Sequence, residues 1–198
     1  MRALLKFSNA VDWVNAQIGK YVIWLILAST VISAVNAVIR KVFNMSSNAY
    51  LEVQWYLFAA AFLLAAGYTL LHGEHVKIDV VSSKLSKRGQ IWIDIIGFSV
   101  FLTPVCLTIL YYGIPFFLQG YRSGEVSANA GGLIRWPVYA MIPLGFGLLL
   151  LQGWSELIKR IAFLKGLIDD PTAKKVEKTA EEELAEAIRR LAESKTAG

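Results

Sequence analysis

The sequence predicts an all-α integral membrane protein with four transmembrane helices. Its 198 residues are 56% hydrophobic and 18% charged, whereas soluble domains are roughly 45–50% apolar and about 25% charged. Four windows of 19 to 22 residues carry almost no charge, and about 20 apolar helical residues cross a hydrocarbon core of about 30 Å. Because these runs are continuous rather than alternating, they predict helices and not the strands of a barrel.

Residues 1–20 have the spacing of an amphipathic helix. Their apolar residues share one helical face, namely Leu4, Phe7, Val11, Val14 and Ile18. Ser8, Asn9, Asp12 and Asn15 face elsewhere. This pattern predicts an N-terminal helix that lies in the membrane interface. A frayed, solvated entry to the first span is the alternative.

The predicted spans are residues 21–39, 53–71, 91–112 and 136–154. Asp94 is the one ionisable residue inside them, in the first turn of its span. The helix dipole stabilises a carboxylate there, which favours a structural role over a proton or ion site. Two prolines, Pro104 and Pro143, are positioned to kink their helices. Isolated glycines are predicted to be helix-packing positions, among them Gly67, Gly97, Gly145 and Gly147.

The positions of the Lys and Arg residues predict the orientation. Near the span ends, ten of them fall on the side of the N-terminus and four on the other side. Since cytoplasmic loops carry the excess of Lys and Arg, both termini are predicted to be cytoplasmic. The loops 40–52 and 119–135 are then outside.

Residues 169–198 differ in composition from the rest of the chain. They hold 6 of the 20 Lys/Arg and 8 of the 15 Asp/Glu. We therefore divide the chain into a membrane domain, residues 1–168, and a charged cytoplasmic tail, residues 169–198. The stretch from Thr179 to Glu182 resembles a capping box, which predicts a short helix in the tail.

The residues alone identify no reaction. One cysteine, Cys106, rules out an intrachain disulfide and a thiolate metal cluster, and His72 and His75 lie at one helix end, where they cannot hold a haem from both sides. The basic charge follows no pattern typical of nucleic-acid binding. Four functions stay open: a membrane subunit of a larger complex, an independent homo-oligomeric channel or transporter, a redox subunit, or an assembly factor.

Several stretches together resemble a known family. Two of them flank the first predicted loop, Arg40-Lys-Val-Phe-Asn44 and Glu52-Val-Gln-Trp55. The longest is Ala66-Gly-Tyr-Thr-Leu-Leu-His-Gly-Glu-His-Val-Lys-Ile-Asp-Val80, which resembles the family's glycine followed by a His-Val-Arg/Lys-hydrophobic-Asp motif. Over about residues 10–165, the chain resembles the small membrane subunit (DctQ-like) of tripartite ATP-independent periplasmic (TRAP) transporters.

Three more features fit one branch of that family, whose members are often associated with carboxylate substrates. They are Leu85-Ser-Lys-Arg-Gly89, Ala130-Gly-Gly-Leu133 and the helix of Pro143. Lys87 stands where the branch has a proline. The charged tail after Asp169 is not part of the pattern.

The resemblance implies a non-enzymatic subunit of a secondary active transporter that imports an organic acid with a sodium gradient. In the family, a larger membrane subunit carries the substrate and sodium sites, and the small subunit packs against its stationary scaffold. A soluble periplasmic protein delivers the substrate. The implied partners are this large TRAP subunit, the binding protein and the lipids of the bacterial inner membrane. No cofactor is expected, because sodium would bind the partner subunit.

The resemblance also suggests residues for the interface with the large subunit or for structural polar contacts. They are Glu52, Trp55, His75, Lys77, Asp79 and Asp94. Glu52 is expected to pair with Arg40 or to cap its own helix. His75, Lys77 and Asp79 are expected to form a cytoplasmic polar cluster near Asp94.

Aromatic and small residues at the start of the second span are expected to pack on the large subunit. They are Trp55, Tyr56, Phe58 and Ala59 to Ala61, and lipid-facing aromatics are the alternative. The candidates for docking the binding protein are Arg40, Arg122, Glu125 and Arg135, with ordinary loop solvation as the alternative.

Overall fold

The structure, a computed structural model, describes residues 1–44, 48–73, 85–129 and 131–171. Its helices are α1 (Arg2–Phe43), α2 (Asn48–His72), α4 (Lys87–Ile96), the π-helix η1 (Gly97–Leu102), α5 (Thr103–Ser123) and α6 (Trp136–Leu164). Four helical segments are long and apolar enough to cross a membrane: α1, α2, the continuous stretch Lys87–Ser123, and α6. This confirms the predicted all-α membrane fold. The predicted tail lies outside the described residues from residue 172 onward.

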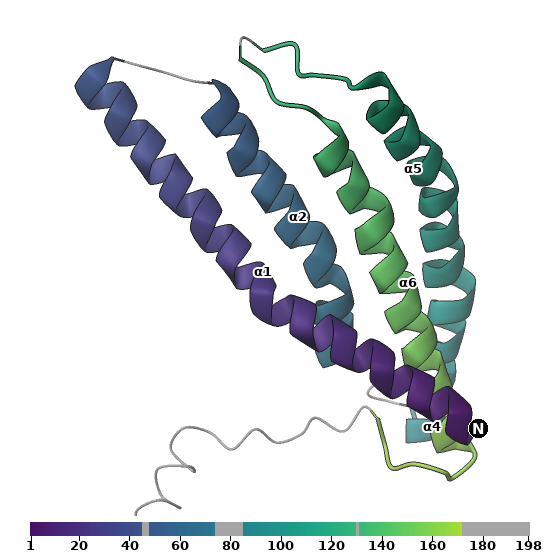
Figure 1. Ribbon diagram of the computed structural model, residues 1–198. Helices are drawn as coiled ribbons and strands as arrows, with labels where there is room; N and C mark the ends of the chain where they lie inside the picture. Colours follow the sequence, from purple (N-terminus) through teal and green to yellow (C-terminus); the bar gives the residue numbers. More distant parts are fainter. Residues whose placement is uncertain (45–47, 74–84, 130, 172–198) are drawn as a thin grey trace, which may run out of the picture.

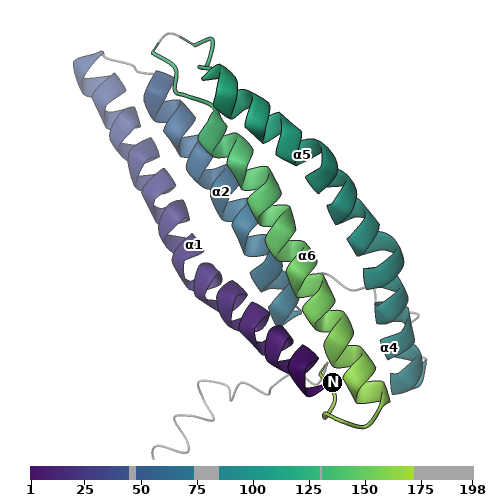
Figure 2. The same cartoon turned by 45° about the vertical axis from the view of Figure 1, so that its right-hand side comes forward.

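The long helices lie side by side in the order α1, α2, α6, α5 (Figures 1 and 2). The helix α6 is central, because it contacts α1, α2, α4, η1 and α5. It also contributes more buried residues than any other helix in the described part of the chain. The two ends of this layer are therefore held together mainly through α6.

One continuous helix, α1, includes both the predicted N-terminal helix and the predicted first span. Its N-terminal part lies beside the C-terminal end of α6 (Figure 1). Here Ser8 and Asn15 are buried, while Leu4, Phe7 and Val14 are exposed. Most of the polar face of this segment therefore packs inside the protein, together with Val11, while the other apolar side chains named here point outward. Its predicted position in the membrane interface stays a prediction.

The third span contains a change of helix type before Pro104. The backbone N–H of Thr103 bonds to the carbonyl of Phe98, five residues earlier, and its hydroxyl donates to the same oxygen at 2.8 Å. Proline has no N–H to donate, and its ring clashes with the carbonyl four residues before it. The π-helical turn of η1 accommodates this interruption within a continuous helical segment.

Two of the four glycines predicted to be packing positions lie at close helix contacts. A Cβ atom on Gly67 would lie 2.2 Å from Oδ1 of Asn15, and one on Gly145 would lie 2.7 Å from the carbonyl oxygen of Leu63. For Gly97 and Gly147 the prediction is wrong, because a Cβ on either would meet nothing within 4 Å. Glycine thus allows close approach at the α1–α2 and α2–α6 contacts.

Gly145→Ala is expected to destabilise the folded chain by about 1–3 kcal/mol, because the backbone of α2 must move away from the added methyl group. The matched control is Gly147→Ala, two residues along the same helix and in open space. Loss of the monodisperse peak on heating in mild detergent measures both variants. Equal transition temperatures for the two variants would contradict this explanation of Gly145.

Candidate functional site

A buried polar network joins the N-terminal part of α1 to the C-terminal half of α6. It is the densest group of side-chain hydrogen bonds and ion pairs among the described residues. We use the term buried polar network for Ser8, Asp12, Asn15, Asp94, Gln152, Ser155, Glu156, Lys159 and Arg160. Its members on α1 repeat every three or four residues, as do those on α6, so each set lies along one helical face.

Hydroxyl and amide groups form one part of the buried polar network. The hydroxyls of Ser8 and Ser155 lie 2.6 Å apart, and Ser155 also donates to Asp12 at 2.8 Å. Asn15 donates its amide to Gln152 at 2.9 Å, and Gln152 donates to Asp12 at 2.8 Å. Ser8, Asn15, Gln152 and Ser155 are fully buried. These contacts satisfy most of the polar groups, which would be costly to bury alone, while Oδ1 of Asn15 is buried without a hydrogen-bond partner among the described residues.

Charged groups of alternating sign form the other part. Lys159 lies between Asp12, at 3.0 Å, and Glu156. Arg160 lies between Glu156 and Asp94, at 2.8 Å from the latter. Its guanidinium also stacks over the ring of Phe98, 4.7 Å from the centroid. Each buried charge thus has an opposite neighbour, which is the condition for burying it.

The buried polar network connects α1, α4 and α6, so its geometry suits it to fix the relative positions of these helices. Within the part of the chain that the structure describes, no group of three His, Cys, Asp or Glu side chains could hold a metal ion. Asp94, the one ionisable residue of the predicted spans, forms an ion pair with Arg160 in this network.

A second polar cluster lies at the opposite end of the bundle, around Glu52. This side chain is 1% exposed. Its carboxylate accepts hydrogen bonds from the side-chain amide of Asn129 at 2.8 Å and from the backbone N–H of Leu133 at 2.6 Å. The expected pairing of Glu52 with Arg40 is wrong: Arg40 is exposed, and no ion pair joins the two in the described residues. Glu52 binds the loop instead of capping its own helix.

The loop between α5 and α6 folds back on itself beside Glu52. Ser127 donates its backbone N–H to Leu133 at 2.9 Å, and Arg135 donates to Glu125 at 2.9 Å. An antiparallel bridge joins Val126 and Ile134. We call residues 124–135 the α5–α6 loop, and Glu52 holds it from the side of α2.

Charged side chains near this loop are the predicted docking candidates. Arg135 pairs with Glu125 at 3.0 Å, and Tyr139 donates its hydroxyl to the same carboxylate at 3.1 Å. A hydrogen bond with Tyr139, reinforced by the charge of Glu125, raises the pKa of Arg135 above its ordinary value. Arg40 and Arg122 are exposed at the ends of α1 and α5. The C-terminal ends of α1 and α5 and the α5–α6 loop, which carry these residues, lie toward the same end of the bundle (Figure 1).

The predicted interface residues of α2 do not form a single surface. Trp55 and Phe58 are 46% and 62% exposed. Tyr56 instead donates its hydroxyl to the carbonyl of Ile134 at 3.2 Å and so belongs to the contacts of the α5–α6 loop. Ala61 is buried in the bundle. The exposed members of this set are therefore Trp55 and Phe58, while Ala59 and Ala60 are half-buried.

Three predicted residues, His75, Lys77 and Asp79, lie outside the described residues. Sequence reasoning also missed Glu156, Lys159 and Arg160, because the fourth span was predicted to end at residue 154 and these charges were read as following it. The helix α6 continues to Leu164. The signal that could have revealed the network is the matching polar spacing in residues 8–15 and 152–160.

Comparison with known families matches residues 29–163 to "Tripartite ATP-independent periplasmic transporters, DctQ component". Comparisons with curated proteins and with solved structures gave no match. The family match covers well over half of the chain. The four helices that are long and apolar enough to cross a membrane agree with the predicted architecture. This protein belongs to the DctQ component family of tripartite ATP-independent periplasmic transporters.

Proposed function

We propose that this chain is the small, non-catalytic membrane subunit of a TRAP transporter that imports an organic acid with a sodium gradient. In this proposal it holds the large transport subunit in place and helps to dock the periplasmic substrate-binding protein. The observation that carries the proposal is the family match over residues 29–163. Substrate and sodium would bind to the large subunit.

The buried polar network supports a scaffolding role. A substrate or ion pathway in a membrane protein needs polar groups that stay open to the solute. Here Asp12, Glu156, Lys159 and Arg160 bind one another across α1 and α6. Charges used in this way stabilise the arrangement of the helices and are not left open to a solute.

The α5–α6 loop supports the proposed docking role. Glu52 and Tyr56 fasten it to α2, which presents Glu125 and Arg135 on a defined backbone. We place this end of the bundle on the periplasmic side of the bacterial inner membrane, with both termini in the cytoplasm. The excess of Lys and Arg on the side of the N-terminus supports this orientation.

Purification of the tagged chain from its native membrane in mild detergent tests the proposal. We expect recovery of one larger, many-spanning membrane protein at near-equal stoichiometry. Replacing Trp55 with alanine is expected to reduce this recovery, because exposed aromatic side chains contribute strongly to interfaces. The matched control replaces an exposed aromatic of α5, Tyr111, with alanine.

Recovery of the chain alone, or only as a homo-oligomer, would exclude the proposed function and favour an independent channel or transporter. Reconstitution of the chain alone in liposomes distinguishes a scaffold subunit from an independent channel or transporter, since a scaffold subunit alone moves no solute. Recovery of the partner with the Trp55 variant equal to that with the Tyr111 control and with the wild type would exclude Trp55 from the interface while leaving the complex established.

A further inference from the structure

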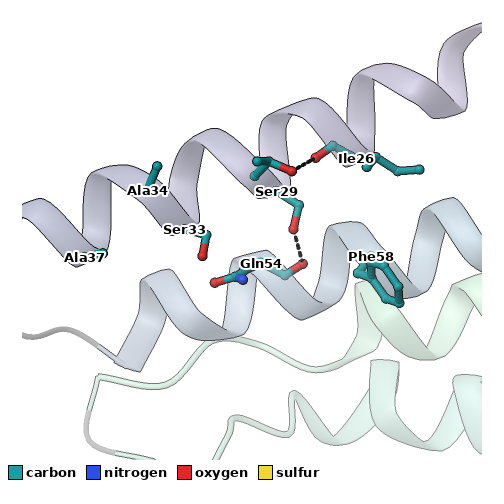
Figure 3. A pocket seen from close by; sticks show the side chains of 8 residues that line it. Ile26, Ser29, Ser33, Ala34, Ala37, Gln54 and Phe58 are labelled. Carbon is teal, nitrogen blue, oxygen red and sulfur yellow. Dashed lines mark hydrogen bonds between the residues drawn. The ribbon is translucent and has the colours of Figure 1, made fainter.

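A groove opens between α1 and α2 at the end of the bundle where α1 ends and α2 begins. It has a volume of about 440 Å³. Six lining residues come from α1, namely Ile26, Ser29, Thr30, Ser33, Ala34 and Ala37, and two come from α2, Gln54 and Phe58. Figure 3 shows these side chains along the two helices. The groove lies between two helices that are long and apolar enough to cross a membrane.

Two half-buried polar side chains of the groove have no hydrogen-bond partner among the described residues. The hydroxyls of Ser29 and Thr30 donate to backbone carbonyls, at 3.0 and 2.9 Å. By contrast, the side chains of Ser33 and Gln54 make no hydrogen bond to any residue that the structure describes. They turn toward each other across the groove (Figure 3). Polar groups without a partner are costly at membrane depth, so these two predict a ligand with polar atoms.

The chemistry of the groove changes in order along α1. Ile26, Ser33 and Arg40 follow one another at intervals of seven residues, which places them on one helical face. Each interval is about 10 Å along the helix axis. From the end of α1 inward, the order is therefore an exposed cation, then the donors of Ser33 and Gln54, then the apolar side chains of Ile26 and Phe58.

We propose that this groove is a specific binding site for a membrane phospholipid. The phosphate lies at Arg40, the ester carbonyls of the glycerol region accept hydrogen bonds from Gln54 and Ser33, and an acyl chain runs along Ile26 and Phe58. The guanidinium of arginine forms charge-assisted hydrogen bonds with phosphate oxygens, so an exposed arginine at a helix end can hold a lipid phosphate. The ester region of a lipid offers acceptors, and the unsatisfied groups here include donors, so the two are complementary.

The test compares phospholipid retention by variants of the full chain purified in mild detergent and incubated with phosphatidylglycerol. Native mass spectrometry counts the lipids bound to each chain. Gln54→Leu and Arg40→Gln are each expected to retain lipid roughly tenfold more weakly, the effect of losing one strong hydrogen bond. The controls are Gln119→Leu and Arg122→Gln. They change exposed residues of the same two types in the last turns of α5, outside the groove.

The proposal is supported if the wild type and both controls retain one lipid while the two groove variants lose it. A phosphatidylglycerol with a photoreactive acyl chain should then crosslink near Ile26 or Phe58. Equal retention by all variants, or equal loss in the controls, would overturn the proposal. Crosslinking of the groove to the large subunit in the intact complex, with no lipid retained, would identify a protein helix as the occupant and would also overturn it.

Discussion

Replacing Arg160 with alanine is expected to destabilise the folded chain by about 3 kcal/mol, near the lower end of the cost of breaking a buried ion pair. Arg160 neutralises two carboxylates, those of Glu156 and Asp94, from a position where its own side chain is 6% exposed. Without it, Glu156 keeps Lys159 as a partner, and the side chain of Asp94 is 22% exposed and can reach water. These two facts keep the cost from being larger.

Thermal unfolding in mild detergent, followed by the loss of the monodisperse peak, measures this effect. The matched control is Lys165→Ala, which removes an exposed cation five residues further along the chain. Surface charges of this kind contribute only about 0–1 kcal/mol. A transition temperature for Arg160→Ala equal to that of the control would show that the ion pairs of Arg160 do not stabilise the fold.

A combined variant separates unpaired charge from lost packing. The triple variant Arg160→Met, Glu156→Gln and Asp94→Asn removes the charge of Arg160 and the charges of its two carboxylate partners. It leaves Lys159 paired with Asp12. Replacing a buried ion pair by neutral groups of similar volume is often close to neutral for stability. The triple variant is therefore expected to be more stable than Arg160→Ala. If the triple variant unfolds at the same temperature or lower, the loss comes from packing and not from uncompensated charge.

Hydropathy was sufficient to predict the four spans, because the cost of burying charge in a bilayer acts on each window separately. It could not predict the buried polar network, because that network depends on which helices meet. Asp12 and Lys159 are far apart in the sequence, and each alone resembles an ordinary interfacial charge. Their pairing at 3.0 Å follows from the crossing of α1 and α6, which no local pattern encodes.

Glu52 illustrates the same limit at the other end of the bundle. An acidic residue near the start of a helix is favourable for the helix dipole, and that local rule suggested a cap. The structure instead turns the side chain toward Asn129 and Leu133. These two residues come from a loop that local rules describe only as polar and rich in glycine. The partners could be found only once α2 and α6 were known to lie side by side.

Glu52→Ala is expected to release the α5–α6 loop from α2. The substitution removes the acceptor of the Leu133 N–H and of the Asn129 amide, at a local cost of about 2 kcal/mol for hydrogen bonds to a charged group. A loss of that size increases the population of the open loop roughly 30-fold, and amide exchange at Leu133 is expected to accelerate by about the same factor. Hydrogen exchange with mass spectrometry of peptides covering residues 124–135 provides the measurement.

The control for this prediction is Glu125→Ala, which removes the exposed pair with Arg135 and keeps both bonds of Glu52. Exchange at Leu133 should change little in the control, because an exposed ion pair contributes only about 0–1 kcal/mol. Slow exchange at Leu133 in Glu52→Ala would contradict the role assigned to the carboxylate.

If the loop docks the binding protein, both variants should weaken docking, but by different routes. Glu125→Ala removes a contact while the loop stays ordered. Glu52→Ala disorders the loop while the charges of the loop stay unchanged. Measuring exchange and docking on the same two variants therefore separates the loop's order from its charge.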